Sequence, residues 1–348
     1  MTVTASGLAG VPLAIEPLTK RDYTSDQEVR WCPGCGDYAV LAAFQSLMPQ
    51  LGIKRENTVI VSGIGCSSRF PYYVDSYGMH SIHGRAPAIA TGVALTRPDV
   101  NVWVVTGDGD ALSIGGNHLI HALRRNVNIT VLLFNNRIYG LTKGQYSPTS
   151  EIGKITKSTP FGSLDTPFNP ISLALGAEAG FVARSIDSDR KHLTEVLTAA
   201  VAHRGASLVE IYQNCPIFND DAFATLKGPE GVLISLRHGE PIVFGGGEYC
   251  VIRTVDGQYK VAATADADEA SIVVHDETRE EPSQAFALSR LTEPGILRQA
   301  PIGIFRRVER PAYDDLVRDQ IRTVEAEDQA AAIAAMIAGK ATWEADER

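Results

Sequence analysis

A chain of 348 residues is long enough to bury a sizeable hydrophobic core, and this length suggests about two domains. Its formal net charge of -9 argues against nucleic acid and anionic membranes as main partners, because both attract basic proteins. No apolar run approaches the roughly 20 residues that cross a bilayer, and the N-terminus has no signal-peptide pattern, so we expect a cytoplasmic protein.

Residues 1–27 are predicted to form an extended or poorly ordered arm, because they mix Gly, Pro, Thr and charged residues without periodicity. Regular structure is expected from about Arg30. Apolar residues at helical spacing predict a helix over 38–47, with Asp37 as its N-cap. A Cys-x-x-Cys pair therefore precedes this helix in a loop.

Short runs rich in Val, Ile and Leu predict the core of the fold. Strands are expected at 58–62, 102–106, 129–134, 183–186 and 207–212, and helices at 88–95, 169–179 and 192–202. The continuous apolar character of the first three strands is typical of parallel strands covered on both faces. The stretch 139–168 is too long for an ordinary connection, so we expect a functional loop. These patterns predict an α/β fold with a doubly wound, mostly parallel sheet.

The last third of the chain has a different texture. Glycine-punctuated alternating runs predict hairpin strands, such as 249–253, and the tail from about 313 to 341 has helical character. We therefore divide the chain into an arm (1–27), an α/β domain (28–227) and a C-terminal extension of hairpins and helix (228–348). The acidic run from Asp266 to Glu281 is expected to be a solvated face.

Polar side chains follow two neighbouring predicted strands. Asp108 lies between Gly107 and Gly109 after one strand, and Asn136 follows the next. Ligands of open α/β sheets bind at the carboxyl ends of parallel strands. The two side chains offer the oxygens with which proteins hold magnesium against a phosphate group. The alternative is an aspartate and an amide that serve only as turn residues.

Four of the five cysteines fall in loops. Cys32 and Cys35 precede the first helix, Cys66 follows the first strand, and Cys215 follows the last strand of the series. A lone Cys-x-x-Cys pair occurs in redox dithiols, zinc sites and iron–sulfur clusters. Two local thiolates and two delivered by separate loops fit a four-cysteine iron–sulfur cluster well. Cys250, in a predicted strand, is expected to be a buried small hydrophobe.

Several blocks of sequence resemble the β subunit of the 2-oxoacid:ferredoxin oxidoreductases, and most closely those that act on 2-oxoglutarate. The blocks are Trp31-Cys32-Pro33-Gly34-Cys35-Gly36, Gly65-Cys66-Ser67, Ile82-His83-Gly84-Arg85, Gly107-Asp108-Gly109-Asp110 and Tyr139-Gly140-Leu141-Thr142-Lys143-Gly144-Gln145. The resemblance covers residues 30–223 and implies that the α/β domain is of the thiamine diphosphate-binding type.

Carried over by position, the resemblance implies a set of ligands. Cys32, Cys35, Cys66 and Cys215 would bind one [4Fe-4S] cluster. Asp108, Asn136 and the backbone carbonyl of Ile138 would hold Mg²⁺ against the diphosphate. The residues expected around the cofactor are Ile64, Gly65, Cys66, Ser67, His83, Gly109, Asp110, Gly140 and Leu141, with Gly109 and Asp110 giving backbone contacts.

The implied reaction is the oxidative decarboxylation of a 2-oxoacid, in the first place 2-oxoglutarate, to its acyl-CoA and CO2. Electrons would pass through the cluster to ferredoxin. Such enzymes need a glutamate from a separate pyrimidine-binding domain, so we expect an α subunit that carries this domain and a coenzyme A-binding domain, in an α2β2 heterotetramer. The alternatives are a pyruvate or broad-range enzyme, and a non-redox thiamine diphosphate-dependent decarboxylase half whose cysteines bind zinc or nothing.

Three residues are candidates for catalysis. Lys143 follows the magnesium ligands, and a cation there would favour a substrate with a second carboxylate, such as 2-oxoglutarate; the alternative is an exposed loop lysine. His83 is placed to reach a diphosphate or a substrate carboxylate, although lone histidines are more often structural. Arg69 follows the Cys66 loop and faces either the substrate or an acidic residue.

Overall fold

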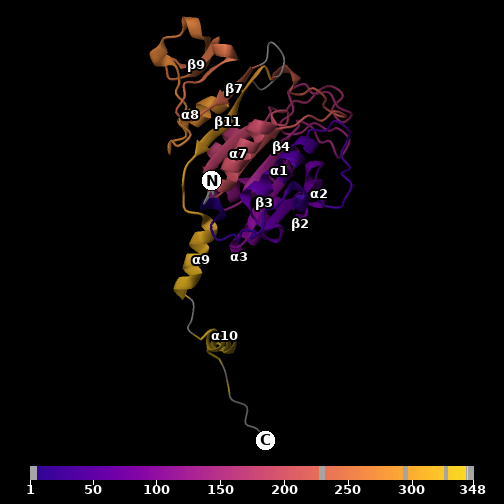
Figure 1. The fold of residues 1–348 in the computed structure, drawn as a ribbon, viewed down its shortest axis with the longest axis vertical. Coiled ribbons are helices and arrows are strands. Elements are labelled where there is room, and N and C mark those ends of the chain that lie inside the picture. The colour runs from indigo at the N-terminus through magenta and orange to yellow at the C-terminus, as the bar shows by residue number, and fades with distance from the viewer. Residues whose placement is uncertain (1–5, 227–231, 293–296, 325–327, 342, 344–348) are drawn as a thin grey trace.

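A computed structural model describes residues 6–226, 232–292, 297–324, 328–341 and 343. Its centre is an eight-stranded sheet covered by helices (Figure 1). From edge to edge the strands are β2 (Tyr77–His80), β1 (Thr58–Ser62), β3 (Asn101–Gly107), β4 (Thr130–Asn135), β6 (Ser207–Tyr212), β5 (Phe181–Ile186), β11 (Gln299–Arg307) and β7 (Val232–Leu236). Neighbouring strands are parallel except β11 and β5. The predicted α/β fold with a mostly parallel sheet is confirmed.

The two faces of the sheet have separate hydrophobic cores. On β3, Val102 and Val104 face one core, whereas Trp103 and Val105 face the other, because successive strand residues point to opposite faces. The first core contains α3 (Ala86–Thr96), α5 (Gly116–Arg125) and α6 (Pro170–Gly176). The second contains α1 (Asp37–Leu51) and α7 (Arg190–Ala202). This covering on both faces explains the unbroken apolar runs in the strands.

The predicted strands and the helices before and after them match observed elements to within a few residues, and no helix or strand interrupts 139–168. The short helices α2 (Phe70–Tyr73) and α4 (Asp108–Leu112) and the strand β2 were not predicted. All four residues of β2 are exposed, so it lacks the continuous apolar run by which the buried strands were predicted.

The predicted N-cap of α1 was wrong. Asp37 is the first residue inside the helix, and Gly36 occupies the N-cap position. The Asp37 side chain is buried beside Cys35, and this burial raises the pKa of Asp37 to about 7. Its carboxyl group thus belongs to the interior under the cysteine loop.

The arm is packed where the structure describes it, from residue 6 onward, and is not poorly ordered there. Tyr23 is fully buried against α1, at the end of a short 3-10 turn (Lys20–Tyr23), and its hydroxyl donates to the carbonyl of Ile53. Composition alone gave no sign of this packing, because one buried aromatic residue anchors an otherwise polar segment. Residues 1–5 lie outside the described residues.

The C-terminal third is divided between two sheets. β7 and β11 join the main sheet, whereas β8 (Val243–Phe244), β9 (Tyr249–Arg253) and β10 (Tyr259–Ala263) form the predicted hairpins, as a separate antiparallel sheet. α8 (Ser283–Ser289) packs against α6 and β11. The predicted boundary between 227 and 228 lies outside the described residues, and the main sheet continues beyond it. The division into three parts stays a prediction.

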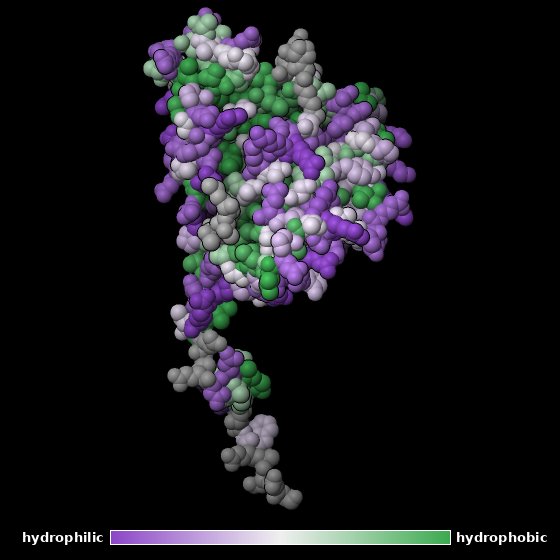
Figure 2. All heavy atoms as spheres, in the orientation of Figure 1, coloured by the Kyte–Doolittle hydropathy of each residue, from purple (hydrophilic) through white to green (hydrophobic). Residues whose placement is uncertain are grey.

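Two helices form the tail, α9 (Tyr313–Val324) and α10 (Gln329–Ala338). α9 packs on α3, whereas α10 projects away from the sheet with Ile333, Met336 and Ile337 exposed on its surface (Figures 1 and 2). Residues 325–327, within the predicted helical tail, lie outside the described residues. No described helix combines the length and apolar character that a membrane span requires.

Candidate functional site

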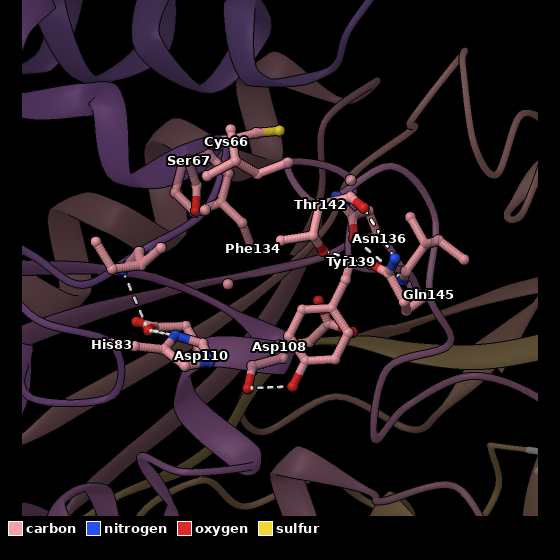
Figure 3. Close-up of a pocket in the computed structure, with 17 residues that line it drawn as sticks. Cys66, Ser67, His83, Asp108, Asp110, Phe134, Asn136, Tyr139, Thr142 and Gln145 are labelled. Atoms are coloured by element: carbon pink, nitrogen blue, oxygen red, sulfur yellow. Dashed lines mark hydrogen bonds and ion pairs between the residues drawn. The ribbon is translucent and has the colours of Figure 1, made fainter. Parts of the chain in front are cut away.

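A cavity of about 570 Å³ opens at the carboxyl ends of β1, β3 and β4 (Figure 3). Three segments meet here because parallel strands bring the segments that follow them to one edge of the sheet. They are 64–67 after β1, the end of β3 with the start of α4 (107–110), and 136–145 after β4; His83, before α3, completes the wall.

The structure brings together at this cavity all the residues predicted to contact the cofactor and all three predicted magnesium ligands. They are Ile64, Gly65, Cys66, Ser67, His83, Gly109, Asp110, Gly140 and Leu141, with Asp108, Asn136 and Ile138. Three of the blocks quoted from the sequence, together with the histidine of a fourth, therefore form one site. The roles of the individual residues stay predictions.

Asp108 is a buried carboxylate held by hydroxyl groups. Ser147 Oγ donates to its Oδ2 at 2.5 Å and Thr149 Oγ1 donates to the same oxygen at 2.6 Å. Burial raises the pKa of Asp108 to about 6, and the two hydroxyls partly oppose this rise. Neither Ser147 nor Thr149 was predicted, because both come from the long loop and no sequence spacing links them to Asp108.

Asn136 is oriented by a hydrogen bond on its nitrogen side. Its Nδ2 donates to Gln213 Oε1 at 3.0 Å. The other end of the amide, Oδ1, accepts from Ile138 N at 3.2 Å. Carboxylate, amide and carbonyl oxygens are the hard donors that Mg²⁺ prefers. In the described part of the chain, the Asp108 carboxylate is bonded to hydroxyls and backbone N–H groups and not to Lys or Arg. A buried carboxylate without a cationic side chain beside it fits a site for a bound cation.

Asp110 uses its side chain, whereas the sequence suggested only a backbone contact. The carboxylate is 2% exposed. It accepts from Ile64 N at 3.1 Å, Gly84 N at 2.7 Å, Thr106 Oγ1 at 2.7 Å and His83 Nδ1 at 2.6 Å. Asp110 thereby joins the loop after β1, the turn before α3 and the end of β3.

Cysteines lie along the same edge of the sheet. A Cβ atom added at Gly140 would lie 3.4 Å from Cys66 Sγ and 3.7 Å from Cys215 Sγ, so both sulfurs face this glycine. Gln213 Nε2 donates to Cys35 Sγ at 3.2 Å. Burial raises the pKa of the Cys66 thiol to about 12 and that of Cys35 further. Nearby thiols contribute to both shifts, which supports the closeness of the four cysteines.

Within the described residues, no three or more His, Cys, Asp or Glu side chains converge closely enough to hold one metal ion. A four-iron cluster sits between its thiolates, so its ligands stay farther apart than those of a single ion. Cys32 is exposed, Cys35 and Cys66 are half-buried, and Cys215 is buried. The four thiols fit the donor set of such a cluster. Cys250 is fully buried in β9, as predicted.

Two of the predicted catalytic residues do not line the cavity. Lys143 is exposed, in a left-handed backbone conformation with φ of 75°. Arg69 donates from its guanidinium group to the carbonyl of Arg30 at 3.2 Å. Their catalytic roles stay predictions, whereas His83, the third candidate, is part of the wall.

Some lining residues were missed at the sequence level. They are Phe134, Tyr139, Thr142 and Gln145. The Tyr139 hydroxyl donates to the Gly109 carbonyl at 3.0 Å, and a Cβ at Gly109 would lie 2.2 Å from the tyrosine ring. All but Phe134 belong to the sequence blocks quoted above. Their place in these blocks could have predicted that they line the cavity. Phe134 looks like any core strand residue.

Comparison with known proteins gives consistent matches. A family model described as "Thiamine pyrophosphate enzyme, C-terminal TPP binding domain" matches residues 63–211. The 2-oxoglutarate oxidoreductase subunit KorB of Mycobacterium tuberculosis is 63% identical over 343 residues, which is 97% of this chain and 91% of that protein. Subunit beta of 2-oxoacid:ferredoxin oxidoreductase 2 from Aeropyrum pernix is 47% identical over 57% of this chain and 64% of that protein.

A solved structure extends the similarity to the whole fold. It is the 2-oxoglutarate:ferredoxin oxidoreductase from Magnetococcus marinus with 2-oxoglutarate, coenzyme A and succinyl-CoA bound. The match has a TM-score of 0.75 and 33% sequence identity, and it covers 94% of this chain and 99% of that chain. The similarity therefore includes most of the C-terminal third, which the sequence blocks did not reach.

Proposed function

The chain belongs to the β subunits of the 2-oxoacid:ferredoxin oxidoreductases, and we propose that it serves a 2-oxoglutarate:ferredoxin oxidoreductase, with one [4Fe-4S] cluster and Mg²⁺-bound thiamine diphosphate. The reaction converts 2-oxoglutarate to its acyl-CoA and CO2 and sends electrons to ferredoxin. One observation carries the proposal: Cys66 lines the same cavity as Asp108 and Asn136. A cluster ligand beside a diphosphate site serves redox chemistry, and the similarity to the 2-oxoglutarate enzymes of Mycobacterium tuberculosis and Magnetococcus marinus favours 2-oxoglutarate over the alternatives.

In this function, thiamine diphosphate supplies the electron sink for decarboxylation. Asp108, Asn136 and the Ile138 carbonyl hold Mg²⁺, and Ser147 and Thr149 keep the Asp108 carboxylate in place through hydrogen bonds to Oδ2. The apolar side chains of Ile64 and Phe134 line the cavity and exclude water from it.

An α subunit is expected to cover the cavity. Leu141, which lines it, is 45% exposed, and two further apolar side chains near His83 in the chain or in space are also exposed, Ile82 at 71% and Ile114 at 52%. Ile82 precedes His83, Ile114 lies against Gly84, and Leu141 is a lining residue. Grouped apolar exposure of this kind marks a protein interface. It supports a site completed by a partner chain, within an α2β2 assembly.

The test is anaerobic co-purification with the α subunit, followed by coenzyme A-dependent reduction of a viologen dye. We expect activity only when both chains are present, with 2-oxoglutarate preferred over pyruvate and branched-chain oxoacids. Activity from the isolated chain would contradict the split site. A preference for pyruvate would contradict the proposed substrate.

A visible spectrum tests the cluster independently of turnover. We expect broad absorbance at roughly 400 nm that bleaches with dithionite, as for a cysteine-bound iron–sulfur centre. Cys32→Ala and Cys215→Ala should lose it, whereas Cys250→Ala should keep it, because Cys250 lies in a separate sheet. A colourless, zinc-containing protein would instead support the non-redox alternative.

A further inference from the structure

The carboxylate of Asp110 accepts hydrogen bonds on both oxygens. Oδ2 accepts from Thr106, and Oδ1 accepts from two backbone N–H groups and from His83 Nδ1, at 2.6 Å. A Cβ atom at Gly63 would lie 1.9 Å from Asp110 Oδ2, so the backbone closes tightly around this group. The carboxylate therefore has one available position, and His83 is held against it.

This contact decides which nitrogen of His83 carries the proton. A carboxylate accepts hydrogen bonds, so the ring nitrogen that faces it, Nδ1, bears the hydrogen of the neutral imidazole. Nε2 then has a lone pair and has no hydrogen-bond partner among the described residues. His83 lines the cavity and its side chain is 37% exposed, so Nε2 is accessible from the cavity (Figure 3).

We propose that Asp110 is a positioning residue that fixes the Nδ1–H tautomer of His83, so that Nε2 accepts a hydrogen bond from an N–H or O–H group of the cofactor or substrate. The proposal rests on the proposed function for the identity of those ligands. This role differs from the one expected from the sequence, because a ring nitrogen that keeps its lone pair repels the lone pairs of a diphosphate or carboxylate. In this role His83 accepts from bound donors.

A purely structural role for Asp110 is the competing explanation, since its carboxylate also joins three segments. A substitution at Thr106 distinguishes the structural explanation from the positioning role. It donates to Oδ2, on the side of the carboxylate away from His83, and does not line the cavity. Thr106→Val therefore weakens the same junction without touching the His83 contact.

The first experiment reads the tautomer by nitrogen NMR of the full chain labelled with 15N-histidine, with His83→Ala to assign the signal. We expect a protonated Nδ1 and a bare Nε2 in the unsubstituted chain and in Thr106→Val. Asp110→Ala should release Nδ1 and let the proton move to Nε2. Asp110→Asn should keep it on Nδ1, because the amide oxygen takes the place of Oδ1 beside the two backbone N–H groups. A protonated Nε2 in the unsubstituted chain overturns the proposal without need of any variant, as does an unchanged tautomer in folded Asp110→Ala.

The second experiment is a double-mutant cycle in the αβ holoenzyme. One oriented hydrogen bond to a reacting group is worth about 10²–10³-fold in rate, so we expect Asp110→Ala and His83→Ala each to lower kcat by about 10²-fold, with KM for 2-oxoglutarate changed less than about threefold. The double variant should be within about twofold of His83→Ala, because Asp110 acts through that ring. Additive losses would overturn the proposal.

The two experiments also separate failure of this inference from failure of the proposed function. An inactive holoenzyme with the expected tautomer would contradict the assigned reaction alone. An active holoenzyme with a protonated Nε2 would contradict the role of Asp110 alone.

Discussion

The hydroxyls beside Asp108 show how much of the proposed magnesium site lies outside its ligands. Thr149 does not line the cavity, yet it donates to the Asp108 carboxylate and fixes its orientation. Groups that support a metal ligand are typically worth about 10–100-fold in metal affinity. We expect Thr149→Val to weaken Mg²⁺-dependent binding of thiamine diphosphate by about 10-fold, measured by calorimetry at fixed cofactor. Thr156→Val, a change of the same size in the same loop, should leave binding unchanged.

Lys143 provides a test of substrate choice. It lies outside the wall of the cavity and is exposed, so it must move or meet a second carboxylate at the mouth to act. If it pairs with that carboxylate, Lys143→Ala should raise KM for 2-oxoglutarate by about 10-fold and leave KM for pyruvate nearly unchanged. Equal changes for both substrates in steady-state assays would show that Lys143 has no part in selection.

His203 makes a pH-dependent contribution to stability. It is buried, and burial lowers its pKa from 6.5 to about 4, with Arg307 adding to the shift. Between these values the unfolded chain binds a proton that the folded chain does not. The contribution is therefore complete above pH 6.5 and is lost as the pH falls toward 4, by about 3 kcal/mol.

Urea denaturation at a series of pH values measures this loss. His203→Leu should flatten the curve between pH 6.5 and 4, because the group that takes up the proton on unfolding is gone. His80→Leu is the control, since His80 is exposed on β2. Identical pH profiles for the two variants would contradict the assignment to His203.

At the scale of single residues, the sequence predicted which residues line the cavity better than which residues hold them in place. Asp108 and Asn136 were predictable because they directly follow apolar strands, and Cys66 because it follows another. Ser147 and Thr149 were not, because a 30-residue loop folds back to reach Asp108 and its path leaves no periodic signal. The side chain of Asp110 was missed for the same reason: three of its four donors come from segments remote in sequence.

At the scale of elements, the turn that leads into α3 depends on a glycine. Gly84 has a φ of +72°, and a Cβ there would lie 2.6 Å from the backbone nitrogen of Gly115. We expect Gly84→Ala to lower the free energy of unfolding by about 2 kcal/mol. The added methyl group would clash with a backbone atom, which cannot move aside as the end of a flexible side chain can. Chemical denaturation measures this, and cofactor binding should weaken as well, since Gly84 N donates to Asp110.

Gly92 is the matched control on the same helix. It lies inside α3 with nothing within 4 Å of its added Cβ. Alanine has a better helix propensity than glycine, so Gly92→Ala should raise the free energy of unfolding by about 0.5–1 kcal/mol. The two substitutions therefore have opposite expected signs. A loss of stability in both would show that α3 tolerates no added methyl group.

Element prediction succeeded where burial on both faces leaves a continuous apolar run, as in β3 and β4. It failed for β2, whose four residues are all exposed. It also failed to place β7 and β11 in the main sheet. β11 is far from β5 in the sequence, so no local pattern indicates that the two strands pair in antiparallel fashion.

On the scale of the whole molecule, a buried ion pair links strands β5 and β6 of the main sheet, and its arginine also contacts β11. Arg184 Nε donates to Glu210 Oε2 at 2.7 Å, and the guanidinium group also reaches the carbonyl of Pro301 on β11. Both partners are at most 1% exposed. Removing one partner of a buried pair costs about 3–5 kcal/mol, so Arg184→Met should lower the free energy of unfolding by this amount in chemical denaturation.

The double variant Arg184→Met, Glu210→Gln should recover part of this loss, because it leaves no buried charge without a partner. Arg97→Met is the control, since Arg97 and Asp99 form an exposed pair worth less than about 1 kcal/mol. A loss no larger for Arg184→Met than for Arg97→Met would contradict the argument.

The exposed edge strand β2 has a consequence for how the protein is made. Among the described strands it pairs with β1 alone. A free strand edge beside exposed apolar residues such as Tyr77 and Met79 is a template for pairing with other chains. If the α subunit covers this edge, a cell that synthesises more of one chain than of the other leaves the surplus open to aggregation and proteolysis. Balanced expression of the two genes is then a requirement set by one short strand.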